Sequence, residues 1–397
     1  MNYRDRILAT LQGEPTDCLP FVPRFDLWYK ANKKRGTLPD KYKNASLMDI
    51  VIDMDIGYHC VVPDFEDYID PLDIVDRALG IYRLRTLPYT TKLRNIKRNI
   101  KYEGDYTSIE YITPVGNIKA KVLFNETMQE AGITVSHIAE HVIKNAKDYE
   151  TVSYIFENIE IIPTYDKYLI LKEEIGERGV VVAPGSVGGS PMHYIEHELM
   201  PYDQFFYHFY DYSQKLNGLA NSIDKYYQKL VKILSQSPAE IIHIGSNYDN
   251  HVTWPPFFEK HITPFLSAAA DTLHNKGKFL LSHTDGENKG LLSCYLASKI
   301  DIADSICPMP MTSLTLKEIR EVFSNKITVW GGIPAVSVLD KSMNDYQFEE
   351  YINNLFEDIS KGDHLILSIS DAIPPDANFS RIKQIAKLAK EFGPVNP

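Results

Sequence analysis

The chain is poor in cysteine. Its 397 residues include four, Cys18, Cys60, Cys294 and Cys307, and no two of them stand in a C-x-x-C spacing. This pattern excludes a disulfide-rich secreted scaffold and a C-x-x-C metal or redox motif. It is typical of a protein from a reducing compartment.

Long hydrophobic runs are also missing. No stretch approaches the roughly 18 consecutive apolar residues that can span a bilayer. The opening sequence, MNYRDRILATLQGEP, has no apolar signal core. We therefore expect a cytoplasmic protein with no membrane partner.

Positive charge is in deficit. The chain has 42 Lys and Arg against 53 Asp and Glu, a net charge of −11, and the two signs are interspersed along the sequence. Such a surface does not attract polyanions, so we expect no nucleic-acid partner. The stretch GSVGGS lacks both the lysine of a P-loop and a GxGxxG spacing, so it does not favour a phosphate site.

Apolar residues, in contrast, are plentiful and regularly placed. Hydrophobic types make up 44% of the chain, enough for a large core. From about residue 145, helical patterns alternate with short apolar runs, which mark strands buried on both faces of a parallel sheet. The pattern predicts an α/β fold, a distorted (β/α)8 TIM barrel, with strands ending near Gly185, Gly245, His283, Cys307, Gly332 and Ser370.

The first third of the chain has a different pattern. Residues 1 to about 60 favour helices around a short apolar strand, and from about 80 to 125 apolar and polar residues alternate. The segment Pro114–Asn117 is a plausible hairpin turn within that alternation. We predict a single domain over 1–397, in which 1–140 includes an N-terminal helical and β-hairpin extension.

Polar and aromatic side chains follow several of the predicted strands. In an α/β barrel the loops after the strands open on one face, where active sites lie. Gly, Pro, Asn and Asp are also ordinary turn residues, and Trp254 could instead pack against neighbouring helices. We predict that a substrate pocket at this face is lined by His193, Asn247, Tyr248, Asp249, His251, Trp254 and Asp371.

The stretch HTDGENKG contains the most chemically suggestive residues. His283 and Asp285 point the same way if the chain stays extended, and Cys307 ends the next predicted strand. Imidazole, carboxylate and thiolate around an open position suit a catalytic zinc. His283 and Glu287 are our candidates for catalytic proton transfer, with helix capping as the alternative for Glu287. His283 could also bond a backbone carbonyl, and Cys307 could be a buried apolar residue.

From about residue 240 to its end, the chain resembles the uroporphyrinogen decarboxylase superfamily, in particular its corrinoid-linked methyltransferase branch. The resemblance lies in KFLLSHTDGENKGLL, IDIADSICPMPMTSLTLKEI, KITVWGGIPAVSVL and LILSISDAIPPDANFSRI. It implies a single barrel of that family. It also implies methyl transfer between a small substrate and a corrinoid carried by a separate protein, assisted by zinc held by His283, Asp285 and Cys307.

One departure from the family pattern affects the chemistry. Asp285 stands where the methyltransferases have a cysteine, and a carboxylate leaves zinc a stronger Lewis acid than a thiolate does. This favours an O-methyl compound over coenzyme M. The alternatives are a decarboxylase-like lyase acting on a carboxylated substrate, which would need clustered arginines such as Arg24 and Arg35, and a metal-free small-molecule-binding barrel.

Overall fold

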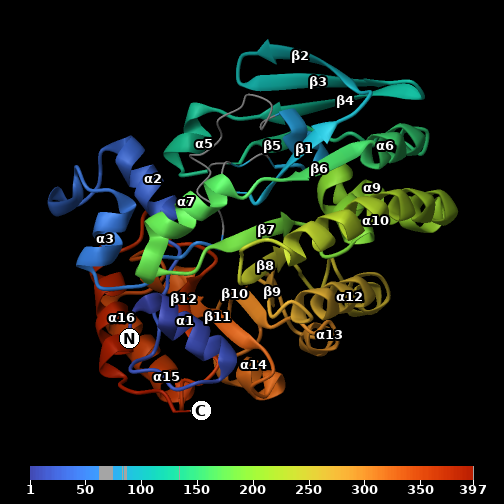
Figure 1. Ribbon diagram of the computed structural model, residues 1–397. Coiled ribbons are helices and arrows are strands. Elements are labelled where there is room, and N and C mark those ends of the chain that lie inside the picture. Colours follow the sequence, from blue (N-terminus) through green and yellow to red (C-terminus); the bar gives the residue numbers. More distant parts are fainter. Residues whose placement is uncertain (62–74, 83, 85–86, 134, 397) are drawn as a thin grey trace.

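A computed structural model describes residues 1–61, 75–82, 84, 87–133 and 135–396. Its centre is a six-stranded sheet in the order β12-β11-β10-β9-β8-β7 (Figure 1). All of its strand pairs are parallel. The strands are β7 (Val182–Ser186), β8 (Ile241–Ile244), β9 (Phe279–His283), β10 (Ile302–Ile306), β11 (Thr328–Pro334) and β12 (Leu365–Ser370). Each ends within two residues of the predicted position, so the predicted parallel α/β sheet is confirmed.

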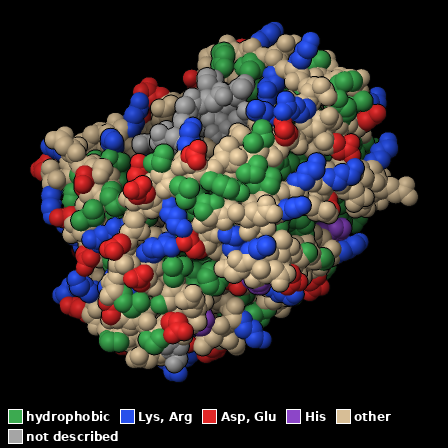
Figure 2. Space-filling view, viewed as in Figure 1, with side chains coloured by type: hydrophobic (Ala, Val, Ile, Leu, Met, Phe, Trp, Pro, Cys, Tyr) green, Lys and Arg blue, Asp and Glu red, His purple; other side chains and the backbone are tan. Residues whose placement is uncertain are grey.

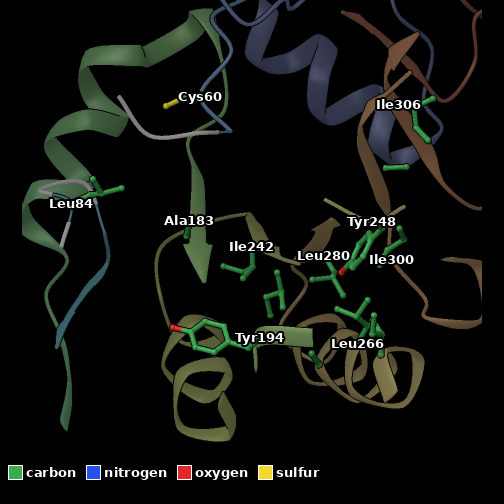
Figure 3. Packing of buried hydrophobic residues seen from close by; sticks show 14 of the residues in the cluster. Cys60, Leu84, Ala183, Tyr194, Ile242, Tyr248, Leu266, Leu280, Ile300 and Ile306 are labelled. Carbon is green, nitrogen blue, oxygen red and sulfur yellow. The ribbon is translucent and has the colours of Figure 1, made fainter. Parts of the chain in front are cut away.

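Crossover helices connect successive strands of this sheet. They form because apolar residues recur at helical spacing; in α10, for example, Leu216, Leu219, Ile223 and Leu230 are all buried. Figure 3 shows Ile242 of β8 and Leu280 of β9 on the side that faces α12, where Leu266 lies. The helices are α10 (Ser213–Ser235), α12 (Thr263–His274), α13 (Leu292–Ala297), α14 (Leu316–Phe323), α15 (Asp345–Ile359) and, after β12, α16 (Phe379–Glu391).

The predicted closed barrel of eight strands is not confirmed. The six parallel strands form an open sheet, and two extended segments lie against its edges without forming full strands. At one edge, the amide of Leu367 donates to the carbonyl of Pro20 at 2.8 Å. At the other edge, the amide of Val182 donates to the carbonyl of Cys60 at 3.1 Å.

The face of the sheet opposite α12 is called the inner face. Towards the amino ends of the strands, which we call the lower end, it carries an apolar layer. Helix α1 (Tyr3–Gln12) covers this layer with Tyr3, Ile7 and Leu11. The layer contains one residue from each strand: Val182, Ile241, Leu281, Ile302, Trp330 and Ile366. Because side chains on a strand alternate between faces, the residue two positions beyond each of these points towards the same face.

The N-terminal part adds helices and an antiparallel sheet. Strands β2 (Lys97–Glu103), β3 (Tyr106–Thr113), β4 (Gly116–Leu123) and β5 (His137–Glu140) pair in that order, and β1 (Tyr89–Leu93) pairs with β6 (Ile159–Pro163). The antiparallel ribbon is thus confirmed, with Thr113 opposite Gly116 at the predicted turn. The assignment of 1–397 to a single domain stays a prediction.

The remaining α-helices of the described residues are short. They are α2 (Asp26–Arg35), α3 (Leu47–Asp53), α5 (Glu126–Glu130), α6 (Asp148–Glu157), α7 (Asp166–Ile175), α8 (Pro191–Tyr194), α9 (Tyr202–Asp211) and α11 (Pro255–Phe257), with π-helical turns at Ile195–Leu199 and Phe258–Ile262. Within the described part of the chain, none of the helices has the length and apolarity required to cross a membrane. Acidic and basic side chains are interspersed over the face seen in Figure 2.

Candidate active site

A pocket of about 340 Å³ opens where the strands of the main sheet end. Its floor continues the inner face of the sheet, because Pro184, His243 and His283 each lie two residues beyond a member of the apolar layer. Apolar walls come from Leu84, Leu87, Tyr89, Val135 and Val187. A pocket at the carboxyl ends of parallel strands is the usual ligand site of α/β folds.

His283 is held at the end of β9 by a carboxylate on the neighbouring strand. Its Nδ1 lies 2.6 Å from Oδ2 of Asp304, and both side chains are buried. Nε2 faces two more carboxylates: Oδ1 of Asp371 lies at 3.4 Å and Oδ2 of Asp285 at 3.7 Å. Nδ1 is therefore fixed as the donor to Asp304, and Nε2 points towards the pocket.

The three carboxylates determine the charge of the imidazole. Burial alone would lower the pKa of His283, but Asp285, Asp304 and Asp371 raise that pKa well above its ordinary range. Conversely, burial would raise the pKa of Asp304, but His283 and His59 hold it well below its usual range. His283 is thus an imidazolium, and Asp304 a carboxylate, at neutral pH.

A local irregularity in β10 accompanies Asp304. The pairing between β10 and β11 shifts after Asp304, and the extra residue, Ser305, has a φ of 62°. Gly331 of β11 lies against this bulge. A Cβ atom at Gly331 would come within 2.6 Å of the carbonyl oxygen of Ile306, so the strand can pass the bulge only with glycine there.

Arg24 contacts Asp371, one of the three carboxylates around His283. Its Nη1 lies 2.9 Å from Oδ1 of Asp371, and its Nε lies 3.0 Å from Oδ1 of Asp26. Partial desolvation would raise the pKa of Asp371, but His283 and Arg24 hold it well below its ordinary range. The guanidinium is therefore shared between two carboxylates.

His243 provides a neutral ring beside the charged one. Burial, followed by the positive charge of His283, lowers the pKa of His243 to about 4. Its Nε2 lies 3.1 Å from the carbonyl oxygen of Gly245, and the centres of the two imidazole rings are 6.4 Å apart. Of these two neighbouring histidines, only His283 is therefore protonated at both ring nitrogens at neutral pH.

A second polar network lies across the pocket. Arg77 forms an ion pair with Glu198, which is completely buried. Glu198 also contacts Nδ1 of His197 at 2.7 Å, and Nε2 of His197 lies 3.1 Å from Nδ2 of Asn247. Burial would raise the pKa of Glu198, but Arg77 and His197 lower it. This carboxylate therefore neutralises the arginine on that wall.

The structure brings four predicted site residues together in the pocket lining: Asn247, His283, Asp285 and Asp371. His193 and Tyr248 lie behind the lining instead. Nδ1 of His193 accepts a hydrogen bond from the amide of Gly189 at 2.9 Å, and its ring lies 5.1 Å from that of Tyr248. Burial lowers the pKa of His193 far below its ordinary value, so it is a neutral core residue.

Asp249 and Glu287 are placed to stabilise loops. Oδ2 of Asp249 accepts from the amide of Glu287 at 3.0 Å. The carboxylate of Glu287 accepts from the amides of Lys289 and Ser313, at 2.9 and 2.8 Å. Both oxygens of Glu287 are thus occupied, and the pocket lining includes neither Glu287, Asp249 nor the exposed His251.

Trp254 packs in an aromatic cluster, away from the pocket lining. Its ring stacks on Phe206 of α9 and Phe257 of α11, with centroid distances of 5.2 and 4.7 Å. Phe209 adds an edge contact at 5.9 Å. The prediction that Trp254 forms the pocket wall is replaced by the alternative of packing against helices.

The predicted zinc ligands do not form a three-ligand group. Cys307 is buried, its Sγ lies 3.9 Å from the carbonyl oxygen of Pro308, and burial together with the charge of Asp285 raises its pKa to about 12. Among the residues that the structure describes, no three His, Cys, Asp or Glu side chains are grouped to hold a metal. Of the three predicted ligands, only His283 and Asp285 lie near a suitable separation, 3.7 Å between Nε2 and Oδ2, because ligand atoms around a tetrahedral ion with bonds of about 2.0 Å lie about 3.3 Å apart. Zinc binding itself stays a prediction.

Several site residues were missed from the sequence. Asp304 carried a signal, because an aspartate inside the apolar run IDIADSIC has to find a buried partner. Arg77, His197 and Glu198 stood in no recognisable motif. Arg24 was predicted only for the lyase alternative, whereas Arg35 forms an ion pair with Asp376 outside the pocket lining.

Fold and pocket together define an α/β protein with a ligand pocket at the carboxyl ends of a parallel sheet. No family model matches the chain, and no curated protein matches it either. Among solved structures, the chain is similar to a methyltransferase from Methanosarcina mazei, with a TM-score of 0.54, 13% sequence identity and coverage of 98% of each chain. At this identity the likeness shows a shared fold.

Proposed function

We propose that the chain is a methyltransferase-like enzyme that takes a methyl group from a small donor in the pocket described above. The observation that carries the proposal is the position of the His283 ring in the pocket lining, beside carboxylates that raise its pKa. The ring is fixed by Asp304 at 2.6 Å and presents Nε2 towards the pocket. The similar fold of a methyltransferase is a second, weaker support.

The chemical role of His283 is that of a general acid. When the bond between a donor oxygen and its methyl carbon breaks, the proton on Nε2 passes to that oxygen, so the leaving group departs as a neutral hydroxyl compound. The methyl carbon forms its new bond to an external nucleophile. Asp304 keeps the ring oriented and stabilises its charge before the transfer. We propose a corrinoid on a separate protein as the methyl acceptor.

Zinc assistance is the competing candidate, because His283 and Asp285 stand at a separation suitable for two ligands. It requires His283 to give up the Nε2 proton, since a metal binds the lone pair of that nitrogen. It also requires a third ligand, and the described residues supply none in place. Acid chemistry needs no rearrangement and is therefore our first proposal.

The lyase alternative has less support. A polycarboxylate substrate needs arginines that are available to it. In the described lining, Arg24 is paired with Asp26 and Asp371, and Arg77 with Glu198. A barrel that binds a small molecule without turnover stays open until turnover is tested.

The test is methyl transfer to a free corrinoid. The purified chain is incubated with reduced cobalamin and a panel of small, deuterium-labelled O-methyl compounds, and labelled methylcobalamin is measured by mass spectrometry. We expect transfer that falls at least about 100-fold in His283→Gln. His137→Gln, on the exposed side of β5, is the matched control. Transfer no faster than without protein, or equal in His283→Gln, would contradict the proposal.

A further inference from the structure

The pocket offers one acceptor atom that the protein leaves unused. Asp285 lines the pocket, and its Oδ1 is buried without a hydrogen-bond partner, whereas its Oδ2 faces His283. A buried carboxylate oxygen without a partner loses the solvation that it had in water. A rotation of the carboxylate that turns this oxygen into the pocket would let an N–H or O–H group of a ligand supply the missing hydrogen bond.

The cations around Asp285 are already compensated. Arg24 lies within 3.0 Å of carboxylate oxygens of Asp26 and Asp371, and Arg77 is paired with the buried Glu198. His283 faces Asp285, Asp304 and Asp371. Lys30 acts on Asp26 and adds one further positive charge. Each of these cations therefore already has at least one carboxylate partner.

The negative charge of Asp285 acts on its surroundings. It contributes to raising the pKa of the Cys307 thiol and of the Tyr295 hydroxyl, after burial, which is the larger cause for each. The same potential acts on any ligand in the pocket. Among the described lining residues no arginine is free to offset it for an anion, whereas a cation would be attracted.

From this geometry we infer that the pocket selects neutral or cationic small molecules carrying one N–H or O–H donor, that Asp285 binds that donor, and that anions are excluded. The inference deepens the proposed function, because it defines the charge class of the methyl donor. It concerns binding, so it can be tested without a methyl acceptor.

The experiment compares three probes of nearly equal size and different charge: protonated benzylamine, benzyl alcohol and benzoate. Isothermal titration of the purified chain at neutral pH should give the affinity order benzylamine, benzyl alcohol, benzoate, with at least about tenfold between the first and the last. In Asp285→Asn, benzylamine should lose about tenfold in affinity, benzoate should bind more tightly, and benzyl alcohol should change little. Asp271→Asn, at an exposed carboxylate of α12 paired with Lys299, should leave all three unchanged.

Binding of benzoate as tight as that of benzylamine would overturn the inference. So would an unchanged order in Asp285→Asn, or failure of all three probes to bind, since a pocket of about 340 Å³ admits each of them. Because the assay needs no methyl transfer, the charge selection can hold even if the proposed chemistry fails. Methyl transfer can likewise occur without this selection.

Discussion

Asp304 is the direct cross-strand partner of His283. The register of β9 and β10 pairs the two residues, and their side chains meet at 2.6 Å, although they are 21 residues apart in the sequence. The hydrogen bond is therefore fixed by the sheet itself, and neither side chain depends on a loop for its position. A group placed in this way is oriented before any ligand arrives.

The pH dependence of turnover should follow the charge of His283. Because its pKa is raised, methyl transfer should persist through neutral pH and fall as pH rises through that pKa. Asp304→Asn removes one of the carboxylates that raise the pKa, so the fall should move to lower pH by about one unit or more. Rates measured from pH 6 to 9 test this, and Asp271→Asn should keep the wild-type profile. An identical profile in Asp304→Asn would contradict the role of Asp304.

The free energy of unfolding should also depend on the protonation of His283. The folded pKa of His283 lies above the unfolded value of about 6.5. Its protonation thus contributes stability that is fully present below about pH 6.5 and is lost as pH rises through the folded pKa. The unfolding free energy of the wild type should exceed that of Asp304→Asn by more at pH 6 than at pH 9. We expect this excess to be larger at pH 6 by about 1 to 3 kcal/mol. Urea unfolding at both values measures it, and a constant difference would argue against a raised pKa.

Metal content separates the two candidate mechanisms. If His283 acts as an acid, the purified chain should contain zinc well below one equivalent, and a chelator should leave the rate of methyl transfer unchanged. Asp285→Cys should bind zinc more tightly, because a thiolate is the softer ligand. Elemental analysis before and after chelation is the measurement. Stoichiometric zinc whose removal abolishes turnover would support the metal candidate instead.

Trp254 should contribute to stability rather than to binding. Replacing it with alanine removes stacking on Phe206 and Phe257 and should cost about 2 to 3 kcal/mol of unfolding free energy. In a chain whose other tryptophans are replaced, a ligand that fills the pocket should leave Trp254 fluorescence unchanged. A large fluorescence change on binding would return Trp254 to the pocket wall.

Gly331 should be required for the position of Asp304. In Gly331→Ala, the new methyl group would clash with the backbone at Ile306, so β10 has to shift at the cost of about 1 to 3 kcal/mol. The same change at Gly218, in α10 with open space around it, should stabilise the chain slightly. Thermal unfolding compares the two variants. Methyl transfer should fall in Gly331→Ala alone.

Strand positions were predictable because each strand is an apolar run bounded by turn residues. The face of the sheet towards which the last side chains of each strand point was less predictable. In β9 the alternation holds and His283 points where expected, but in β10 the extra residue Ser305 interrupts it before Cys307. No residue type in that segment signals a bulge. The sequence therefore predicted the end of the strand but not the surroundings of the thiol.

The long-range pairs were beyond sequence reasoning. Arg77 and Glu198 are 121 residues apart, and neither stands in a pattern that points to the other. Trp254 and Glu287 fall at strand-end loops, as predicted, but loop packing gives their side chains structural partners. The location of the pocket followed from topology, whereas its charge balance needed three-dimensional contacts.

The two layers on the inner face of the sheet have separate roles, packing in the lower layer and chemistry in the upper one. Helix α1 and one apolar residue from each strand close the lower layer, and His243, His283 and Asp304 stand one step above it. We expect conservative substitutions in the upper layer to leave the contacts of α1 in place, because His243, His283 and Asp304 do not belong to the lower layer. The scaffold can therefore accept a new set of polar groups on an unchanged foundation. A designer could therefore exchange the chemistry of this pocket one strand position at a time.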